Sequence, residues 1–384
     1  MTGNILIVAG EASGDVHGAN LIKALKEIDP SLVFYGVGGE GMKRLGFGAI
    51  EDSKELAVVG ISEVFLKLGR LFSVFNRLKR RLDEKRPDAV VLIDYPDFNL
   101  HFAKEAKKRG IPIIYYICPQ VWAWRKGRIK KISRLVNKAL VVFPFEEELY
   151  RNAGIDVEYV GHPLSGIVFC RFSKEDALSS LGMGHGPVIA LLPGSRRHEV
   201  ERLLPAMLDA CMLIKKEIND VQFVLPLADT IEKGFVEDII RNFQFPIPNS
   251  QFKATIVQDR IYEALKASDA AIVASGTATL EAAMMEVPMV ITYKLSLLTA
   301  IIGRLFVRIE RIGLPNIVAG KEIVPELVQG DATPAAIAQE VLRFLKDKDA
   351  RNNVISELKE IRKKLGSGDA SKKAAEAIYK IIRN

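Results

Sequence analysis

The segment Ile93-Asp94-Tyr95-Pro96-Asp97-Phe98-Asn99 places two carboxylates where a buried strand pattern gives way to a loop. Strands of parallel sheets are usually apolar, so charged residues at this point are unusual. A carboxylate here can take a proton from an attacking hydroxyl, provided that burial or a neighbouring acid raises its pKa toward the working pH. Asp94 is therefore a candidate general base, whereas Asp97 is also explained as the cap of the following helix.

A second acidic segment, Gly10-Glu11-Ala12-Ser13-Gly14-Asp15, ends the first apolar run of the chain. Ligands of open α/β sheets bind outside the carboxyl ends of strands, and glycines allow close approach to the backbone. Glu11 is thus a second candidate catalytic acid. The spacing is not G-x-G-x-x-G, which argues against a dinucleotide cofactor. The alternative is that Asp15 caps a helix and Glu11 is solvated.

Two later segments combine a strand end, small residues and a helix start. Gly194, Ser195 and Arg196 follow the apolar run 188–192, and the arginine offers a forked donor that matches phosphate oxygens. A tight turn with a solvent-facing arginine is the alternative. The second segment begins with Ser275, Gly276 and Thr277. Both segments predict a site for the diphosphate of a nucleotide.

Two further polar residues are candidates for the same ligand. Glu281 lies one turn into the helix after Thr277, where a carboxylate can accept hydrogen bonds from ribose hydroxyls, although an acidic first turn also stabilises a helix dipole. Asn316, in the loop 313–320, is an amide able to orient sugar or phosphate, or a turn-forming residue.

The segment 62–82 predicts an amphipathic helix with apolar side chains at helical spacing and many cations around them. This combination is typical of a helix that lies in a membrane interface, and also of a core helix with a solvated face. The candidate membrane residues are Val64, Phe65, Leu68, Leu71, Phe72 and Phe75. A second basic cluster, 125–134, follows Trp122 and Trp124 and suits lipid contact or nucleic-acid stacking.

The elements that carry these segments alternate between short β-branched runs and longer helical patterns, which indicates parallel βαβ winding. The rhythm restarts after Gly161-His162-Pro163, so two doubly wound α/β domains are expected, with a linker near 163–171 and a helical tail. A length of 384 residues also favours two domains.

Composition narrows the class of protein. The five histidines and three cysteines show no metal-ligand spacing, so no metal site is expected. No export signal or uninterrupted apolar span of about 20 residues is recognised, which favours a cytoplasmic protein. The net charge of +7 favours an anionic partner such as a phosphorylated ligand, acidic lipid or nucleic acid.

Taken together, seven segments in one order resemble the lipid-A-disaccharide synthase family, over about residues 4 to 330. They are Gly10 to Asp15, Ile93 to Asn99, Pro119 to Trp124, Gly161 to Leu164, Leu192 to Arg196, Ser275 to Glu281 and Leu314 to Gly320. The resemblance implies a GT-B fold, two Rossmann-like domains facing each other across a cleft. Residues 1–165 would form the acceptor and membrane-facing domain and 166–365 the UDP-sugar domain, with a tail helix at 366–384 packing on the first domain or on a partner subunit in a homodimer.

The resemblance also implies the reaction. UDP-2,3-diacylglucosamine and 2,3-diacylglucosamine 1-phosphate (lipid X) would give a β-1,6-linked disaccharide 1-phosphate and UDP, with inversion and without a metal or other cofactor. Asp94 would take the acceptor proton, with Glu11 and Asp97 positioning the acceptor or tuning the base. Arg196, the turn 275–277 and Asn316 would stabilise the diphosphate, and Glu281 would hold the ribose. The enzyme would lie on the inner face of the inner membrane.

Other functions fit parts of the pattern. Another GT-B enzyme, such as the transferase that forms lipid II or a UDP-N-acetylglucosamine 2-epimerase, would share the strand-end sites. A basic, non-catalytic protein that binds nucleic acid or anionic lipid would explain the charge but would leave Asp94 without a role, so no nucleic-acid partner is expected.

Overall fold

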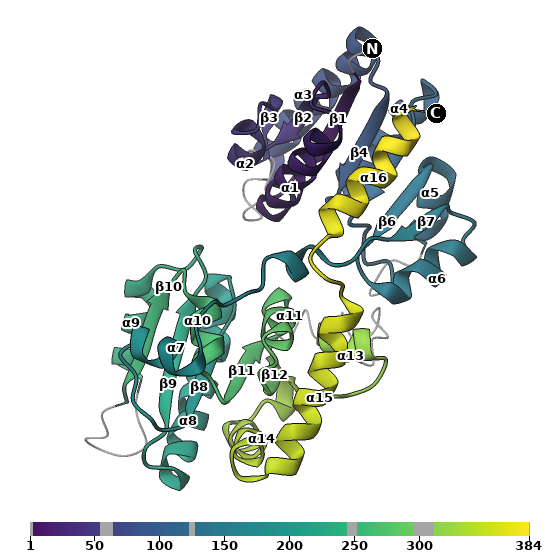
Figure 1. The fold of residues 1–384 in the computed structure, drawn as a ribbon. Coiled ribbons are helices and arrows are strands. Elements are labelled where there is room, and N and C mark those ends of the chain that lie inside the picture. The colour runs from purple at the N-terminus through teal and green to yellow at the C-terminus, as the bar shows by residue number, and fades with distance from the viewer. Residues whose placement is uncertain (1–2, 54–63, 123–126, 244–251, 295–310, 384) are drawn as a thin grey trace. The chain divides into compact units, whose positions relative to one another are not determined.

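The computed structural model describes residues 3–53, 64–122, 127–243, 252–294 and 311–383. They form two compact units, unit 1 (Met1–Gly166 with Leu365–Asn384) and unit 2 (Ile167–Lys364), as Figure 1 shows. Each unit contains one parallel sheet with helices between successive strands, as the alternating pattern predicts. The change of unit at Gly166 falls within the Gly, Pro and Ser-containing stretch 163–171.

The sheet of unit 1 has the strand order β3-β2-β1-β4-β5-β6-β7. Its strands are β1 Asn4–Ala9, β2 Val33–Gly38, β3 Gly48–Asp52, β4 Ala89–Ile93, β5 Ile113–Tyr116, β6 Lys138–Val141 and β7 Val157–Tyr159. Its helices are α1 Ala12–Ile28, α2 Glu40–Lys43, α3 Val64–Lys85, α4 Pro96–Lys108, α5 Arg128–Leu135, α6 Pro144–Asn152 and α16 Ala370–Arg383. Strands β1 and β4 pair in register, with Ala9 opposite Ile93, so their carboxyl ends lie side by side.

The sheet of unit 2 has the strand order β10-β9-β8-β11-β12-β13. Its strands are β8 Val188–Leu192, β9 Gln222–Leu227, β10 Ala254–Gln258, β11 Ala270–Ala274, β12 Met289–Tyr293 and β13 Glu326–Val328. Its helices are α7 Lys174–Ser180, α8 Arg197–Glu217, α9 Lys233–Asn242, α10 Ile261–Ala267, α11 Thr277–Met284, α13 Leu314–Ala319, α14 Pro334–Lys346 and α15 Lys348–Lys364. Val273 pairs with Leu192, so β8 and β11 also end next to each other.

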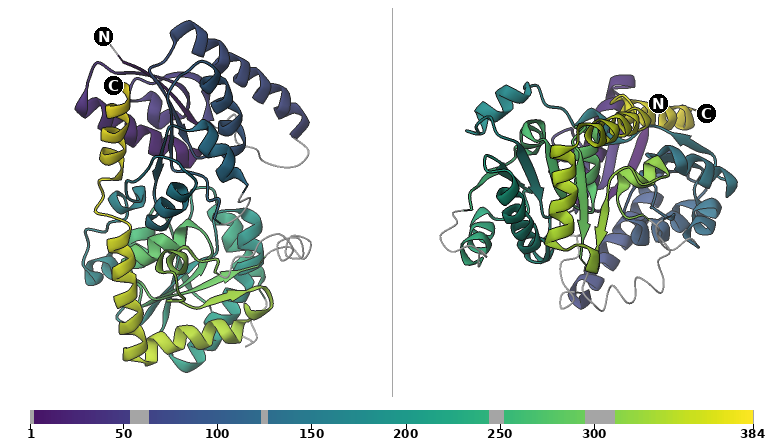
Figure 2. Two further views of the ribbon diagram at one scale, coloured as in Figure 1. Left: turned by 90° about the vertical axis from the view of Figure 1, so that its right-hand side faces the viewer. Right: turned by 90° about the horizontal axis from the view of Figure 1, so that it is seen from below.

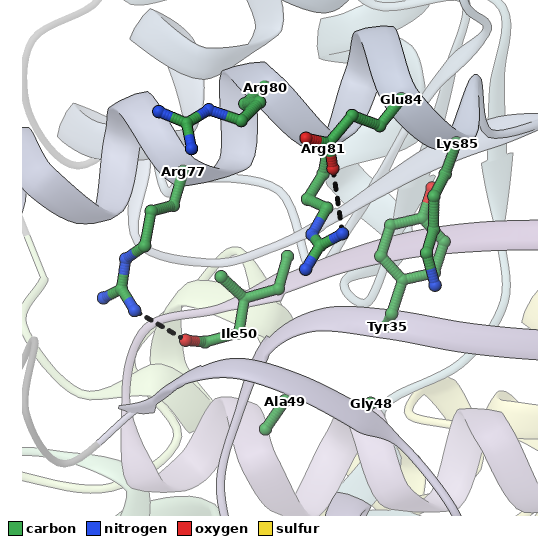
Figure 3. Close-up of a pocket in the computed structure, with 9 residues that line it drawn as sticks. All are labelled: Tyr35, Gly48, Ala49, Ile50, Arg77, Arg80, Arg81, Glu84 and Lys85. Atoms are coloured by element: carbon green, nitrogen blue, oxygen red, sulfur yellow. Dashed lines mark hydrogen bonds and ion pairs between the residues drawn. The ribbon is translucent and has the colours of Figure 1, made fainter.

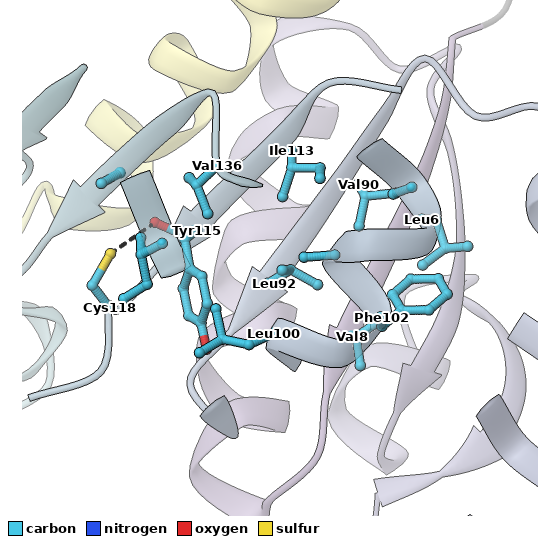
Figure 4. Packing of buried hydrophobic residues seen from close by; sticks show 14 of the residues in the cluster. Leu6, Val8, Val90, Leu92, Leu100, Phe102, Ile113, Tyr115, Cys118 and Val136 are labelled. Atoms are coloured by element: carbon cyan, nitrogen blue, oxygen red, sulfur yellow. Dashed lines mark hydrogen bonds between the residues drawn. The ribbon is translucent and has the colours of Figure 1, made fainter. Parts of the chain in front are cut away.

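One face of the unit 1 sheet carries a continuous apolar core. Alternate side chains of β1 and β4, such as Leu6, Val8, Val90 and Leu92, belong to one buried cluster with Phe102 of α4, as Figure 4 shows. The period-two pattern of a strand places these residues on the same face. This packing fixes the strand ends from which the acidic segments leave.

Helix α3 uses its apolar residues in two ways. The Phe75 ring makes edge contacts with Phe98 and Phe102, at centroid distances of 5.9 and 6.2 Å, and Leu71 also packs on the core. The structure therefore corrects the membrane prediction for Leu71 and Phe75, because their helical spacing faces the core. Phe72 is 68% exposed and stays a candidate. The side chains of Val64, Phe65 and Leu68 lie outside the described part of the chain.

The C-terminal helix α16 packs along α1 of its own chain (Figures 1 and 2). Arg383 forms an ion pair of 2.6 Å with Asp29, and the Tyr379 hydroxyl lies 3.3 Å from the same carboxylate. The backbone N–H of His162 donates to Leu365 O, at the point where the chain returns to unit 1. In the described ranges, no helix combines the length and the apolar character needed to cross a bilayer.

Candidate active site

The backbone turns sharply at the end of β4. Asp94 and Tyr95 both have left-handed φ angles, +44° and +47°. Aspartate tolerates this conformation, whereas a bulky aromatic residue adopts it only where surrounding contacts hold it. The Tyr95 ring packs on Gly10 at the end of β1, where a Cβ atom would lie 2.4 Å from the ring. Gly10 is thus needed for ring packing, and the strained turn is held by the neighbouring strand.

Two side chains hold the Asp94 main chain in place. The Tyr115 hydroxyl and the Asn99 amide each donate to Asp94 O at 2.7 Å, and Asn99 Nδ2 also donates to Ile93 O at 3.2 Å. Asn99 is fully buried, so its position is fixed by packing. These bonds hold the Asp94 side chain at the strand edge, as a general base requires.

Burial and, to a smaller extent, the negative charge of Glu11 raise the pKa of Asp94 to about 6, against a lowering by the Tyr95 backbone N–H. A carboxyl with this pKa is mostly ionised at pH 7 and still basic enough to accept a proton. The charge of Glu11 thus contributes to the raised pKa of Asp94, while the catalytic roles of both residues stay predictions. Glu11 itself is exposed.

The other acids of these segments have different partners. Asp97 is exposed in the first turn of α4 and pairs with Arg128. Asp15 accepts hydrogen bonds from the backbone N–H groups of Gly39, Gly41 and Met42, at 2.8 to 3.0 Å. Asp15 therefore has a structural role, as the sequence alternative holds, but it caps α2 from a position inside α1 rather than the helix that follows it.

A cavity of about 250 Å³ adjoins Asp94, and Gln120 and Arg128 contribute its polar side chains. Arg128 is only 8% exposed, so its positive charge is largely shielded from solvent beside the candidate base. Sequence reasoning placed Arg128 in a basic cluster for lipid or nucleic acid and missed this position. The contact between Arg128 and Asp97 spans 31 positions of the chain, which no local pattern predicts.

The wall of this cavity is held from behind by α6. The buried Glu146 carboxylate accepts from Trp122 Nε1 at 3.0 Å and from Phe143 N at 3.1 Å, and Tyr150 donates to Pro119 O at 2.8 Å. Burial raises the pKa of Glu146 to about 7. The segment 119–122 is thus positioned by a buried polar network rather than by its own turn.

The histidine of Gly161-His162-Pro163 is neutral at pH 7. Burial lowers its pKa to about 3, with a smaller effect from the charge of His17, and burial lowers the pKa of His17 to about 4. Among the described residues, no hydrogen bond links either histidine to Asp94. The segment Gly161-His162-Pro163 instead binds the chain where it returns to unit 1, because His162 N donates to Leu365 O.

In unit 2, a cavity of about 490 Å³ lies at the adjoining ends of β8 and β11. Its lining includes seven of the eight residues that the sequence assigns to the nucleotide: Gly194, Ser195, Arg196, Ser275, Gly276, Thr277 and Glu281. The volume is within the range typical of small-molecule sites. The structure therefore brings together seven residues that their positions at strand ends predicted to share a site.

The two helix starts in this cavity differ in whether their N–H groups are free. Glu199 Oε2 accepts from Ser195 N and Arg196 N, at 3.1 and 3.2 Å, so a carboxylate of the protein occupies the start of α8. Gly194 allows this approach, because a Cβ there would lie 2.6 Å from Glu199 and its φ is +122°. At α11, no described residue accepts a hydrogen bond from the N–H groups of Gly276, Thr277 and Ala278. The α11 start is therefore the open anion site.

Arg196 and Glu281 complete this cavity. The Arg196 side chain is 71% exposed and its guanidinium pairs with Glu199 at 3.0 Å. Glu281 Oε1 accepts from the Tyr262 hydroxyl at 3.1 Å, while burial raises the Glu281 pKa. Among the described residues, the second carboxylate oxygen of Glu281 has no hydrogen-bond partner.

Asn316 departs from its predicted role. Its side chain is fully buried, and its amide donates to Val324 O and Glu326 and accepts from Ile323 N and Val324 N. Asn316 lies on helix α13 rather than in a loop, and its four hydrogen-bonding positions are all used by residues 323–326, so none is left for a phosphate. Asn316 instead supports Glu326, which holds Ile312 N, and Ile312 O accepts from Ser275.

The two parallel-sheet units, each with its polar residues at the strand ends, define a class of protein by its fold, the GT-B class. The whole chain superposes on the UDP-GlcNAc 2-epimerase of Neisseria meningitidis solved with UDP-GlcNAc, with a TM-score of 0.66, 14% identity and coverage of 98% of this chain and 100% of that one. MurG of Acinetobacter baumannii gives a TM-score of 0.59, 15% identity and coverage of 98% and 99%. At this identity the likeness concerns the fold.

Sequence comparison is more specific. The family model of lipid-A-disaccharide synthetase matches residues 5–382. The lipid-A-disaccharide synthase of Syntrophus aciditrophicus is 46% identical over 99% of this chain and 98% of its own length, and that of Geobacter sulfurreducens is 43% identical over 98% and 97%. The chain belongs to the lipid-A-disaccharide synthetase family, and the resemblance drawn from seven short segments is confirmed.

Proposed function

We propose that this chain transfers 2,3-diacylglucosamine from UDP-2,3-diacylglucosamine to the 6-hydroxyl of lipid X. The products are the β-1,6-linked disaccharide 1-phosphate and UDP. Membership of the family over nearly the whole chain supports the reaction. The observation that carries the mechanism is the carboxylate of Asp94, with a raised pKa and a clamped backbone at the end of β4.

In this proposal Asp94 is the general base of a single displacement. Its carboxylate takes the proton from the acceptor 6-hydroxyl as that oxygen forms a bond to C1 of the donor sugar. The bond between C1 and the diphosphate oxygen breaks, and its electron pair leaves with UDP. The attack comes from the side opposite the leaving group, so an α-linked donor gives a β-linked product.

The leaving diphosphate gains negative charge and needs positive groups around it. The free N–H groups at the start of α11 provide these, with the N-terminal end of the helix dipole behind them. Arg196 contributes a guanidinium, which is largely exposed and pairs with Glu199. Glu281 binds the ribose with its free carboxylate oxygen. We propose that this set of groups makes the reaction independent of a metal ion.

On the acceptor side, the cavity beside Asp94 offers Arg128 as a cation for the 1-phosphate of lipid X. A guanidinium matches phosphate in a forked geometry. Asp97 then holds Arg128 in place rather than contacting the reacting atoms, which refines its predicted role as a positioning residue.

Both substrates carry acyl chains, so we propose that the enzyme works as a peripheral protein at the cytoplasmic face of the inner membrane. The exposed Phe72 ring on α3 supports this placement. Serine replacements of Phe65, Leu68 and Phe72 together are expected to move the protein from membrane to soluble fractions, and unchanged partitioning would contradict the proposal. A homodimer through the C-terminal helices stays a prediction, since α16 packs on α1 of its own chain.

Incubation of the purified protein with both substrates and a chelator tests the reaction, with mass analysis of the lipid product. A disaccharide 1-phosphate together with released UDP is the expected result. Rearrangement of UDP-N-acetylglucosamine without an acceptor would instead support the 2-epimerase reading that the fold alone permits. Product formation only after metal is restored would refute metal independence and leave the reaction itself in place.

A further inference from the structure

A second cavity in unit 1 has no part in the proposed chemistry. Its volume is about 470 Å³, and it lies between the second half of α3 and the strands β2 and β3 (Figure 3). It shares no lining residue with the cavity beside Asp94. Four basic side chains and a single carboxylate line it, namely Arg77, Arg80, Arg81, Lys85 and Glu84.

Two of these cations are already neutralised. Arg77 donates to Ile50 O at 3.1 Å and pairs with Glu51, and Arg81 pairs with Glu84 at 2.9 Å. Arg80 and Lys85 have no carboxylate partner in the described ranges. Lys85 instead stands over the Tyr35 ring, with Nζ 4.9 Å from the centroid. The cavity therefore has an excess of positive charge that the protein itself does not balance.

A buried hydroxyl points to the same conclusion. Tyr35 is 3% exposed, and its hydroxyl has no hydrogen-bond partner among the described residues. Burial raises the pKa of Tyr35 to about 12, so the group stays protonated and able to donate. Leaving a buried donor without an acceptor is costly, and a ligand oxygen in the cavity would satisfy it.

We propose that this cavity binds the phosphate headgroup of an anionic membrane lipid. Arginine and lysine side chains together with a hydroxyl donor suit phosphate oxygens. The volume exceeds what a bare ion needs and is typical of a small-molecule site, so the glycerol or sugar next to the phosphate also fits. The site is separate from the residues of the glycosyl transfer.

The position on α3 favours a lipid over a soluble phosphate. Phe72 and Arg80 are eight residues apart, which at 3.6 residues per turn places them about 80° apart around the axis of α3 and so on the same half of its surface. The ring of Phe72 is 68% exposed. One side of α3 thus offers an exposed ring and, two turns further on, an unpaired cation beside the cavity, as an interfacial helix does.

The test compares two double variants in binding to vesicles. Arg80→Gln with Lys85→Gln removes the unpaired cations of the cavity, and Lys104→Gln with Lys107→Gln removes two exposed cations of α4 as the matched control. The vesicles contain equal parts of phosphatidylcholine and phosphatidylglycerol, or phosphatidylcholine alone. The cavity variant is expected to bind the anionic vesicles roughly 30-fold more weakly than the parent, since each cation near an anionic surface contributes about fivefold.

The control variant is expected to lose no more than a few fold, because its charges lie outside the cavity. Equal losses in the two variants would overturn the proposal, since they would show that net charge alone decides binding. Binding of inorganic phosphate as strong as that of the anionic vesicles, judged by competition, would overturn the lipid assignment.

Tyr35→Phe provides a second variant that leaves the charge unchanged. It removes a buried hydroxyl that has no described partner, so the fold is expected to be as stable as before. Anionic vesicle binding should fall roughly tenfold, and an unchanged affinity would overturn the proposal. All these variants should retain turnover of detergent-dispersed substrates, which separates failure of this site from failure of the proposed function.

Discussion

Replacing Asp94 with asparagine is expected to abolish turnover and at the same time to stabilise the protein at neutral pH. Burial raises the pKa of Asp94 from 3.8 to about 6, which means that its ionised form is disfavoured in the folded state. At 1.36 kcal/mol per pKa unit, the ionised carboxylate destabilises the fold by up to about 3 kcal/mol at pH 7 and above. Asparagine tolerates the left-handed φ of this position and carries no charge.

The sign of the pH dependence follows from the raised pKa. Below pH 4 both the folded and the unfolded chain hold the proton, so the parent and the asparagine variant are expected to differ little. Between about pH 4 and pH 6 the advantage of the variant should grow, and above pH 7 it should level off. Urea unfolding of both proteins across this pH range measures the difference.

Asp97→Asn is the matched control, because it removes an exposed carboxylate that pairs with Arg128. It is expected to bring no gain in stability at any pH. A stability difference for Asp94→Asn that is constant with pH, or a loss of stability at pH 8, would refute the reasoning about burial.

Three further substitutions test the positions around the two sites. Gly10→Ala should reduce kcat by roughly 100-fold, because the new Cβ displaces the Tyr95 ring and with it Asp94. Gly234→Ala is the control, since no atom lies within 4 Å of a Cβ built there. Equal activity of the two variants would contradict this prediction. Asn316→Ala should lower the free energy of unfolding by about 2 to 4 kcal/mol, since it removes four buried hydrogen bonds. An unchanged Tm together with a large loss of UDP affinity would instead show that Asn316 contacts the phosphate directly. Glu281→Ala should reduce the preference for UDP over 2′-deoxy-UDP roughly tenfold in binding measurements, and an unchanged preference would place the ribose elsewhere.

The sequence predicts the central strands better than the edge strands β3, β7 and β13. Strands such as β4 and β11 are buried along their whole length, so their apolar β-branched runs are unmistakable. The edge strands β3, β7 and β13 are short and partly exposed, so their residues show no continuous apolar run. Strand β4 ends at Ile93, and Asp94 begins the left-handed turn.

For the sites, strand ends predict which residues gather but not how they share hydrogen bonds. The glycine, serine and arginine at 194–196 do line the nucleotide cavity, yet Glu199 occupies their N–H groups. An acid three residues after Arg196 is a capping pattern that sequence reasoning overlooked. The burial of Asn316 depends on packing against residues 323–326, which its own turn-like sequence does not reveal.

The most direct test of Asp94 as the general base is the pH dependence of kcat/KM for the parent and for Glu11→Gln. The parent is expected to lose activity tenfold per pH unit below an apparent pKa near 6, because the base must be ionised. Removing the charge of Glu11 should shift this acidic limb to lower pH. Full turnover by Asp94→Asn would contradict the account. An acidic limb that stays at the same pH in Glu11→Gln would contradict it as well.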